Sequence, residues 1–173
     1  NITFGPNIVK ALKKITSKVL DVHLMITPVL KYVEEFIEAG SNIITFHPEA
    51  DENHNEIINL ISKSNCKPGL AIHPDITINS IEHLLPKVEL VTVMTVVPGF
   101  GGQKFLESQL QKITKLSEIK NNKQLNFEIE VDGGINDITA KKCVKHGANV
   151  LVAGSYIFSN KSSEYKNIIN SLR

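Results

Sequence analysis

Three apolar runs in the second half of the chain stop abruptly at glycines. They are VTVMTVVPGFGG (91–102), IEVDGG (129–134) and VLVAGS (150–155). Such runs are typical of buried strands in parallel α/β proteins, where ligands bind at the strand ends. Glycines there leave backbone N–H groups uncovered and free to turn towards an anion. We therefore expect a phosphate cradle, although Pro-Gly and Gly-Gly in the first run fit an ordinary turn equally well.

The whole chain alternates between segments of strand and helix length. Apolar spacing predicts the helices, with Asn7 capping the first and Thr27-Pro28 opening the second. The helices are expected over residues 7–18, 27–40, 53–64, 76–85, 105–119, 137–146 and 162–172, and the strands over residues 18–26, 42–46, 67–72, 91–97, 127–131 and 149–153.

Strands alternating with helices predict βαβ units and a parallel sheet. A closed (β/α)₈ TIM barrel takes about 250 residues, or roughly 30 per unit, so the 173 residues correspond to about six units. We expect one TIM-barrel domain over residues 1–173 that lacks its first two strands. Barrel enzymes commonly bind phosphate after strands seven and eight, which would be the last two runs here. Periodicity alone also allows an open, doubly wound sheet.

Composition narrows the class of function. The net charge is +1 and the lysines are scattered, so no nucleic-acid or membrane partner is predicted. Cys66 and Cys143 lie far apart without metal-ligand spacing, which suits a reduced, cytoplasmic protein with structural thiols. No apolar run is long enough to span a bilayer, and nothing resembles a signal peptide.

Asp132 is the sharpest candidate for chemistry, because it places a carboxylate at the end of a strand and before two glycines. A carboxylate that only caps a turn is the alternative. His23 also ends a predicted strand, and alone it fits a core histidine. Together the two side chains suit zinc, manganese or iron, although two ligands are too few for a tight site.

Four other side chains are predicted near the same strand ends. His47 is a candidate substrate contact, and His73 fits a turn before Pro74 equally well; both rank below His23. Met25 and Met94 fit the wall of a pocket, although core packing explains them as well.

Taken in order, several segments closely resemble the ribulose-phosphate 3-epimerase family. They are DVHLM, FHPEA, GLAIHP, VMTVVPGFGGQKF, EIEVDGGIN and VAGSYIF, and NITFGP resembles the end of the family's second strand-to-helix loop. The resemblance covers essentially the whole chain. It implies a (β/α)₈ barrel enzyme that interconverts ribulose 5-phosphate and xylulose 5-phosphate in the pentose phosphate pathway.

The resemblance also implies roles for individual residues. His23 and Asp132 would be ligands of one divalent metal ion (Zn, Fe, Mn or Co), and Asp132 would be one of two catalytic carboxylates. Met25 and Met94 would line the pocket, and the enzyme would be a homo-oligomer that acts on a small phosphorylated ketose. The substrate would contact His23, Gly99, Phe100, Gly101, Gly102, Asp132, Gly133, Gly134, Ile135, Gly154 and Ser155.

The chain departs from the family pattern in two places. Val97 precedes Pro98 where the family usually has glutamate, which removes a carboxylate near the site. The family's motif of His and Asp just ahead of the NITFGP loop supplies two metal ligands and the second catalytic acid, and we expect it upstream of Asn1. Two other functions remain open: epimerisation of a related ketose phosphate such as allulose 6-phosphate, and phosphosugar binding without catalysis.

Overall fold

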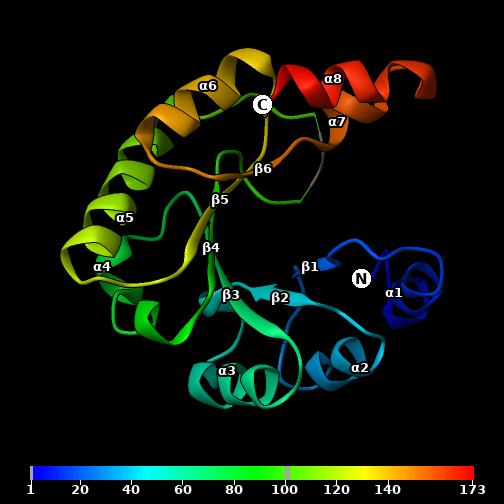
Figure 1. Ribbon diagram of the computed structural model, residues 1–173. Coiled ribbons are helices and arrows are strands. Elements are labelled where there is room, and N and C mark those ends of the chain that lie inside the picture. The colour runs from blue at the N-terminus through cyan, green and yellow to red at the C-terminus, as the bar shows by residue number, and fades with distance from the viewer. Residues whose placement is uncertain (1, 100–101) are drawn as a thin grey trace.

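A computed structural model describes residues 2–99 and 102–173. Six strands form one parallel sheet in the order β1-β2-β3-β4-β5-β6, so each strand pairs with the next one in sequence. A doubly wound sheet reverses its strand order part-way, so the sequential order excludes that alternative. The sheet curls, with helices along its outside (Figure 1). The predicted six-unit segment of a TIM barrel is confirmed.

The elements alternate along the chain as expected. The strands are β1 (Asp21–Leu24), β2 (Ile43–Phe46), β3 (Lys67–Ile72), β4 (Leu90–Met94), β5 (Glu128–Asp132) and β6 (Val150–Val152). The helices are α1 (Pro6–Lys13), α2 (Val33–Glu38), α3 (His54–Lys63), α4 (Ile78–Ile81), α5 (Leu110–Asn122), α6 (Asp137–His146), α7 (Gly154–Phe158) and α8 (Tyr165–Ser171). Short 3₁₀ turns are η1 (Pro48–Ala50), η2 (Leu85–Lys87), η3 (Glu107–Gln109) and η4 (Ser162–Glu164).

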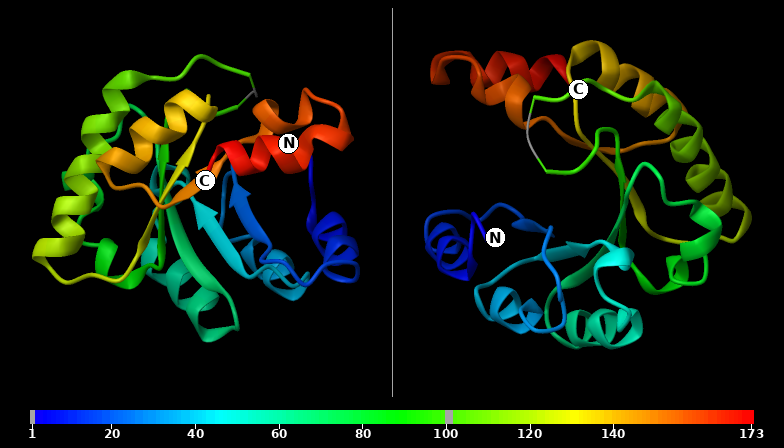
Figure 2. Two further views of the ribbon diagram at one scale, coloured as in Figure 1. Left: turned by 45° about the horizontal axis from the view of Figure 1, so that its top comes forward. Right: turned by 180° about the vertical axis from the view of Figure 1, so that it is seen from behind.

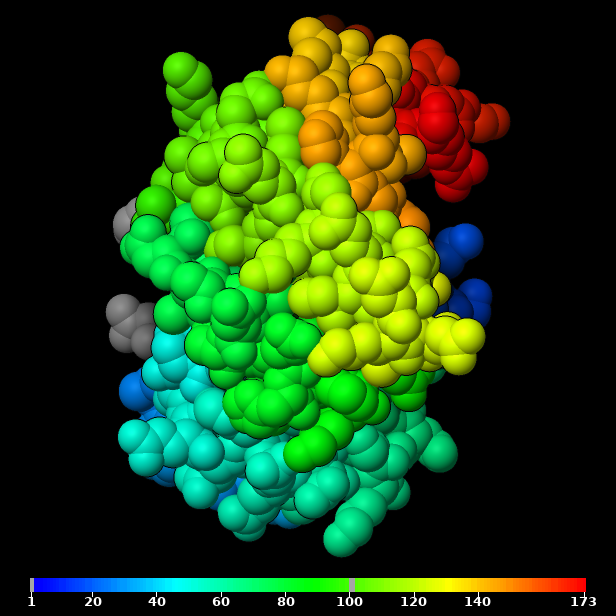
Figure 3. Space-filling view, turned by 90° about the vertical axis from the view of Figure 1, so that its left-hand side faces the viewer, coloured from blue at the N-terminus to red at the C-terminus, as the bar shows by residue number. Residues whose placement is uncertain are grey.

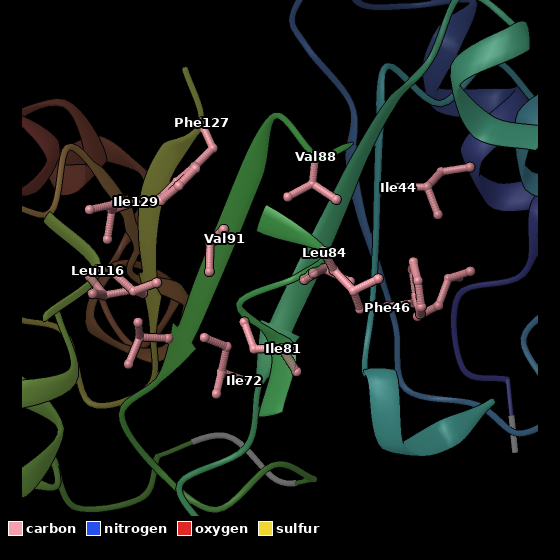
Figure 4. Close-up of a cluster of buried hydrophobic side chains, with 14 of the residues drawn as sticks. Ile44, Phe46, Ile72, Ile81, Leu84, Val88, Val91, Leu116, Phe127 and Ile129 are labelled. Atoms are coloured by element: carbon pink, nitrogen blue, oxygen red, sulfur yellow. The ribbon is translucent and has the colours of Figure 1, made fainter. Parts of the chain in front are cut away.

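The outer face of the sheet carries the hydrophobic core. Because side chains alternate across a strand, every second residue points towards the helices. In Figure 4 these strand residues meet side chains of α4, α5 and the segment after α4. Those labelled on strands are Ile44, Phe46, Ile72, Val91 and Ile129, and all are at most 1% exposed. This packing fixes the strands and therefore positions whatever their ends carry.

The helices form a continuous layer over the outer face, as Figure 3 shows for α4, α5 and α6. Figure 2 places α1 and α8 at the two ends of the curl. In the part of the chain that the structure describes, no helix has the length and apolar character needed to cross a membrane.

The first two helices begin elsewhere than predicted. Gly5 is the N-cap of α1 and Pro6 takes the first turn, so Asn7 is not the cap. The second helix begins at Val33, and Thr27-Pro28 does not open it. Instead, Thr27 Oγ1 donates to the carbonyl of Ala50 at 2.5 Å. That hydroxyl therefore ties the segment before α2 to the β2–α3 loop rather than capping a helix.

Other boundaries differ in ways that local hydrogen bonds explain. The predicted helix from 105 starts only at η3 and α5, because Leu106 N–H donates to Thr95 O at 2.8 Å and holds that residue extended. The last predicted helix divides into η4 and α8, and α7 was not predicted. Strand β3 and helix α6 have the predicted bounds.

Candidate functional site

A cavity of about 180 Å³ lies at the carboxyl ends of β4, β5 and β6. It brings the three glycine-rich segments together. Its lining is Met25, Met94, Val96, Pro98, Gly99, Gly102, Gln103, Asp132, Gly133, Gly134, Ile135, Val152, Gly154 and Ser155. No lysine or arginine is among these described lining residues, so an anion here would meet mainly backbone N–H groups. Phe100 and Gly101 lie outside the described residues.

Two glycines after β5 leave no room for a side chain. Gly133 has φ +119°, and a Cβ there would lie 2.4 Å from Cγ2 of Val96. Gly134 has φ +63°, and a Cβ there would lie 2.8 Å from the backbone nitrogen of Phe105. Both the left-handed backbone and the close neighbours therefore require glycine.

Hydroxyl groups hold this loop in place. Thr95 Oγ1 donates to the carbonyl of Gly133 at 2.6 Å and lies 3.0 Å from that of Asp132. Thr139 Oγ1 donates to Gly134 O at 2.9 Å and accepts from Asn136 N–H at 2.9 Å. Because Asn136 and Thr139 form the capping box of α6, the start of that helix also anchors the glycine loop.

Asp132, which lines this cavity, lies close to His23, which is not among the lining residues. Asp132 Oδ2 lies 3.7 Å from His23 Nδ1, and the two side chains are 27% and 18% exposed. His23 Nε2 lies 2.9 Å from Nε2 of His47, whose Nδ1 is 3.1 Å from Glu49 Oε1. Burial, and next the neighbouring His23, lower the pKa of His47. His47 was a weaker candidate than His23 on sequence grounds, yet the two side chains are in direct contact.

The His23 and Asp132 side chains fit two positions around a divalent cation. Imidazole and carboxylate suit zinc, iron and manganese, and the 3.7 Å between the two ligand atoms leaves room for one ion to contact both. Among the described residues, no cluster of three or more His, Cys, Asp or Glu side chains is arranged to hold a metal. This chain therefore offers two ligands of such a site.

A second cavity, of about 640 Å³, adjoins the first. Met25 and Pro98 border both cavities, and His47, Glu49 and His73 line the second. Met94 is 1% exposed and Met25 is 45% exposed, so only Met25 presents much of its surface to solvent. His73 Nδ1 accepts from the backbone N–H of Asp75 at 3.3 Å, which fits its predicted turn role.

Glu130 carries a buried carboxyl group that was not predicted from the sequence. It is 4% exposed and accepts a hydrogen bond from Thr92 Oγ1 at 2.8 Å. Burial, and next the charge of Asp21, raise the pKa of Glu130 to about 8. The signal was present in EIEVD, since glutamate and aspartate alternate with apolar residues and so face the inside of the barrel.

The two cysteines take no part in the site. Both Cys66 and Cys143 are buried free thiols. Burial raises the pKa of each to about 11, which disfavours the reactive thiolate. The structural role predicted for them agrees with this environment.

The sequence matches the ribulose-phosphate 3 epimerase family over residues 1–158. It is 41% identical to the ribulose-phosphate 3-epimerase of Bacillus subtilis, in an alignment that covers 100% of this chain and 79% of that protein. The chain belongs to the ribulose-phosphate 3-epimerase family. It is also 41% identical to the chloroplastic ribulose-5-phosphate-3-epimerase of Arabidopsis thaliana, over 100% of this chain and 62% of that protein.

Solved structures outside the epimerase family share the fold. A 3-hexulose-6-phosphate synthase from Salmonella typhimurium superimposes with a TM-score of 0.74 at 20% identity, over 96% of this chain and 79% of that one. A mutant tryptophan synthase α-subunit from Pyrococcus furiosus gives 0.72 at 15% identity, over 96% and 71%. At these identities the likeness establishes the barrel architecture alone.

Proposed function

We propose that this protein interconverts ribulose 5-phosphate and xylulose 5-phosphate. The observation that carries the proposal is the cavity, in which Asp132 shares a wall with all three glycine-rich segments. A carboxylate beside an anion cradle is what epimerisation of a phosphorylated sugar needs. Membership of the epimerase family supports the same substrate.

The glycine-rich segments are assigned to the phosphate. Backbone N–H groups near Gly99, Gly102 and Gly134, with those that begin α7 at Gly154 and Ser155, would anchor it without a cationic side chain. Anchoring the phosphate fixes the sugar so that its carbon 3 stays beside the reacting groups, which lowers the entropic part of the barrier.

Asp132 is assigned to one of two proton transfers. Its carboxylate takes the proton from carbon 3, and the electron pair of the C–H bond moves towards the carbonyl at carbon 2 to give an enediolate. A second acid then returns a proton to the opposite face of carbon 3, which yields the other epimer. One turnover leaves Asp132 protonated and the second acid ionised, and proton exchange with solvent restores both groups, so the reaction consumes no proton overall.

His23 and Asp132 would hold the divalent metal ion. Their donor types and the 3.7 Å separation support this role. When bound, the ion would stabilise the negative charge that develops on the sugar oxygens. His23 would help to hold the ion in place, and Asp132 would also move the proton at carbon 3.

Conversion of five- and six-carbon ketose phosphates tests the proposal. With a divalent ion supplied, we expect ribulose 5-phosphate to be converted to xylulose 5-phosphate with a higher kcat/KM than allulose 6-phosphate is epimerised. A preference for allulose 6-phosphate would move the assignment to that substrate. Binding of both sugars without conversion of either would leave a phosphosugar-binding protein and contradict the proposal.

A further inference from the structure

A chain of hydrogen-bonding side chains runs from the second cavity to His23, which lies beside Asp132. Glu49 Oε1 lies 3.1 Å from Nδ1 of His47, and Nε2 of His47 lies 2.9 Å from Nε2 of His23. The ring centroids of the two histidines are 5.0 Å apart and their planes are inclined by 23°. Because the two nitrogens are much closer than the centroids, the rings meet at their Nε2 edges, as a hydrogen bond between them requires.

The carboxylate sets the direction of this chain. A carboxylate only accepts hydrogen bonds, so Nδ1 of His47 must donate to Glu49. A neutral imidazole has one donor and one acceptor nitrogen, which leaves Nε2 of His47 as the acceptor. His47 is only 6% exposed, and this burial favours the neutral ring. His23 must then donate from its own Nε2.

The other nitrogen of His23 is thereby left with its lone pair. Nδ1 of His23 and Oδ2 of Asp132 lie 3.7 Å apart, which is beyond hydrogen-bond length. Two acceptors at this separation disfavour each other unless a cation binds both. The direction imposed at Glu49 therefore prepares His23 to bind a cation together with Asp132.

We propose that Glu49 and His47 are positioning residues that hold His23 in its Nε2–H tautomer, with the Nδ1 lone pair facing Asp132 to receive a divalent cation. The inference deepens the proposed function and rests on it for the identity of the site. A metal-binding histidine commonly has a hydrogen-bond partner at its other nitrogen. Loss of that partner typically lowers metal affinity by about 10- to 100-fold.

The pair His73 and Asp75 provides a matched control. Nδ1 of His73 lies 3.6 Å from Oδ2 of Asp75, whose side chain is 90% exposed, and His73 lines the same second cavity as Glu49. Here Nδ1 accepts from a backbone N–H rather than donating to the carboxylate. Asp75→Asn thus removes a carboxylate beside a histidine without touching the chain to His23.

The first test is the tautomer of His23, read from ¹⁵N chemical shifts of the imidazole nitrogens in the metal-free protein. We expect the Nε2–H form in the unsubstituted protein and in Asp75→Asn. In Glu49→Gln the amide can donate as well as accept, so the direction is no longer imposed and the Nδ1–H form should gain population. An Nδ1–H tautomer of His23 in the unsubstituted protein would overturn the proposal.

The second test is the affinity for Zn²⁺, measured by competition with a chelator and without substrate. His47→Leu removes the acceptor and should weaken binding by about 10-fold or more, whereas His47→Gln keeps an acceptor oxygen and should restore most of the loss. Equal loss in both variants, or unchanged affinity in His47→Leu, would overturn the proposal. Because neither test uses a sugar, failure of the epimerase assignment would show separately, in the conversion assay.

Discussion

The two faces of the sheet are built from the same strands but differ in role: the outer face packs against the helices, and the inner face carries the candidate site. The outer face is apolar, with Ile44, Phe46 and Val131 fully buried against the helices. The inner face carries the polar side chains of His23, Glu130 and Asp132. Alternation along a strand separates the two sets by a single residue. We therefore expect that stability and chemistry can be altered independently at neighbouring positions of one strand.

The largest effect is expected on the inner face. Asp132→Asn keeps the size of the side chain but removes the carboxylate that accepts the proton. Turnover of ribulose 5-phosphate should fall by about 10²- to 10⁴-fold, with binding of inorganic phosphate largely retained. The thermal unfolding temperature should change little, because the side chain is 27% exposed. A variant with near-normal turnover would contradict the role of Asp132.

A substitution on the outer face should instead lower stability and leave ligand binding close to normal. Phe46 is 0% exposed, so Phe46→Ala should leave a cavity and lower the free energy of unfolding by about 3–5 kcal/mol. Denaturant unfolding measures this loss. At a temperature where the variant remains folded, its affinity for inorganic phosphate should be close to normal. Weak phosphate binding by a stably folded variant would show that the two faces are not independent.

Gly133 directly follows β5, and its replacement tests how far the loop backbone shapes the site. In Gly133→Ala the positive φ costs about 1–3 kcal/mol, and the new Cβ collides with Val96. Affinity for phosphate should fall by about 10-fold, as isothermal titration would measure. Adding Val96→Ala should relieve the collision but not the backbone strain, and so recover only part of the affinity. Full recovery would mean that the backbone conformation is unimportant.

The boundaries of the elements follow from sequence where local signals suffice. Helix α6 has the predicted bounds because Asn136 caps its start and Gly147 ends it with φ +114°. Thr27-Pro28 misled the prediction, since the threonine hydroxyl bonds to Ala50, 23 residues away. Local patterns carry no information about such a partner. Helix α7 was missed because it has only five residues and follows directly after a strand end.

In the site, too, the features that depend on local motifs were predicted, and those that depend on contacts between strands were not. The motifs predicted which residues stand at strand ends, and therefore that His23, Asp132 and the glycines would be neighbours. The link from His23 through His47 to Glu49 was not predicted, because it depends on how β1 and β2 align. The buried Glu130 was overlooked for a similar reason: its environment comes from Asp21 and Thr92 on other strands.

The smallest expected effect concerns the pH dependence of stability. Burial raises the pKa of Glu130 from 4.5 to about 8, so the folded protein keeps a proton that the unfolded chain releases. Stability should therefore fall as pH rises from about 5 to about 8 and level off above that. Glu130→Gln should remove this dependence, which has a slope of up to about 1.4 kcal/mol per pH unit. Denaturant unfolding of the metal-free protein measures the slope, and an unchanged slope in the variant would contradict the assignment.

Transfer of deuterium from solvent to carbon 3 shows whether the protein exchanges the proton at that carbon. Ribulose 5-phosphate is incubated with the protein and a divalent ion in D₂O, and the products are followed by NMR. We expect xylulose 5-phosphate that carries deuterium at carbon 3, with exchange slowed by about 10²- to 10⁴-fold in Asp132→Asn. Xylulose 5-phosphate formed without deuterium at that carbon, or exchange at a normal rate in Asp132→Asn, would contradict the proposed mechanism.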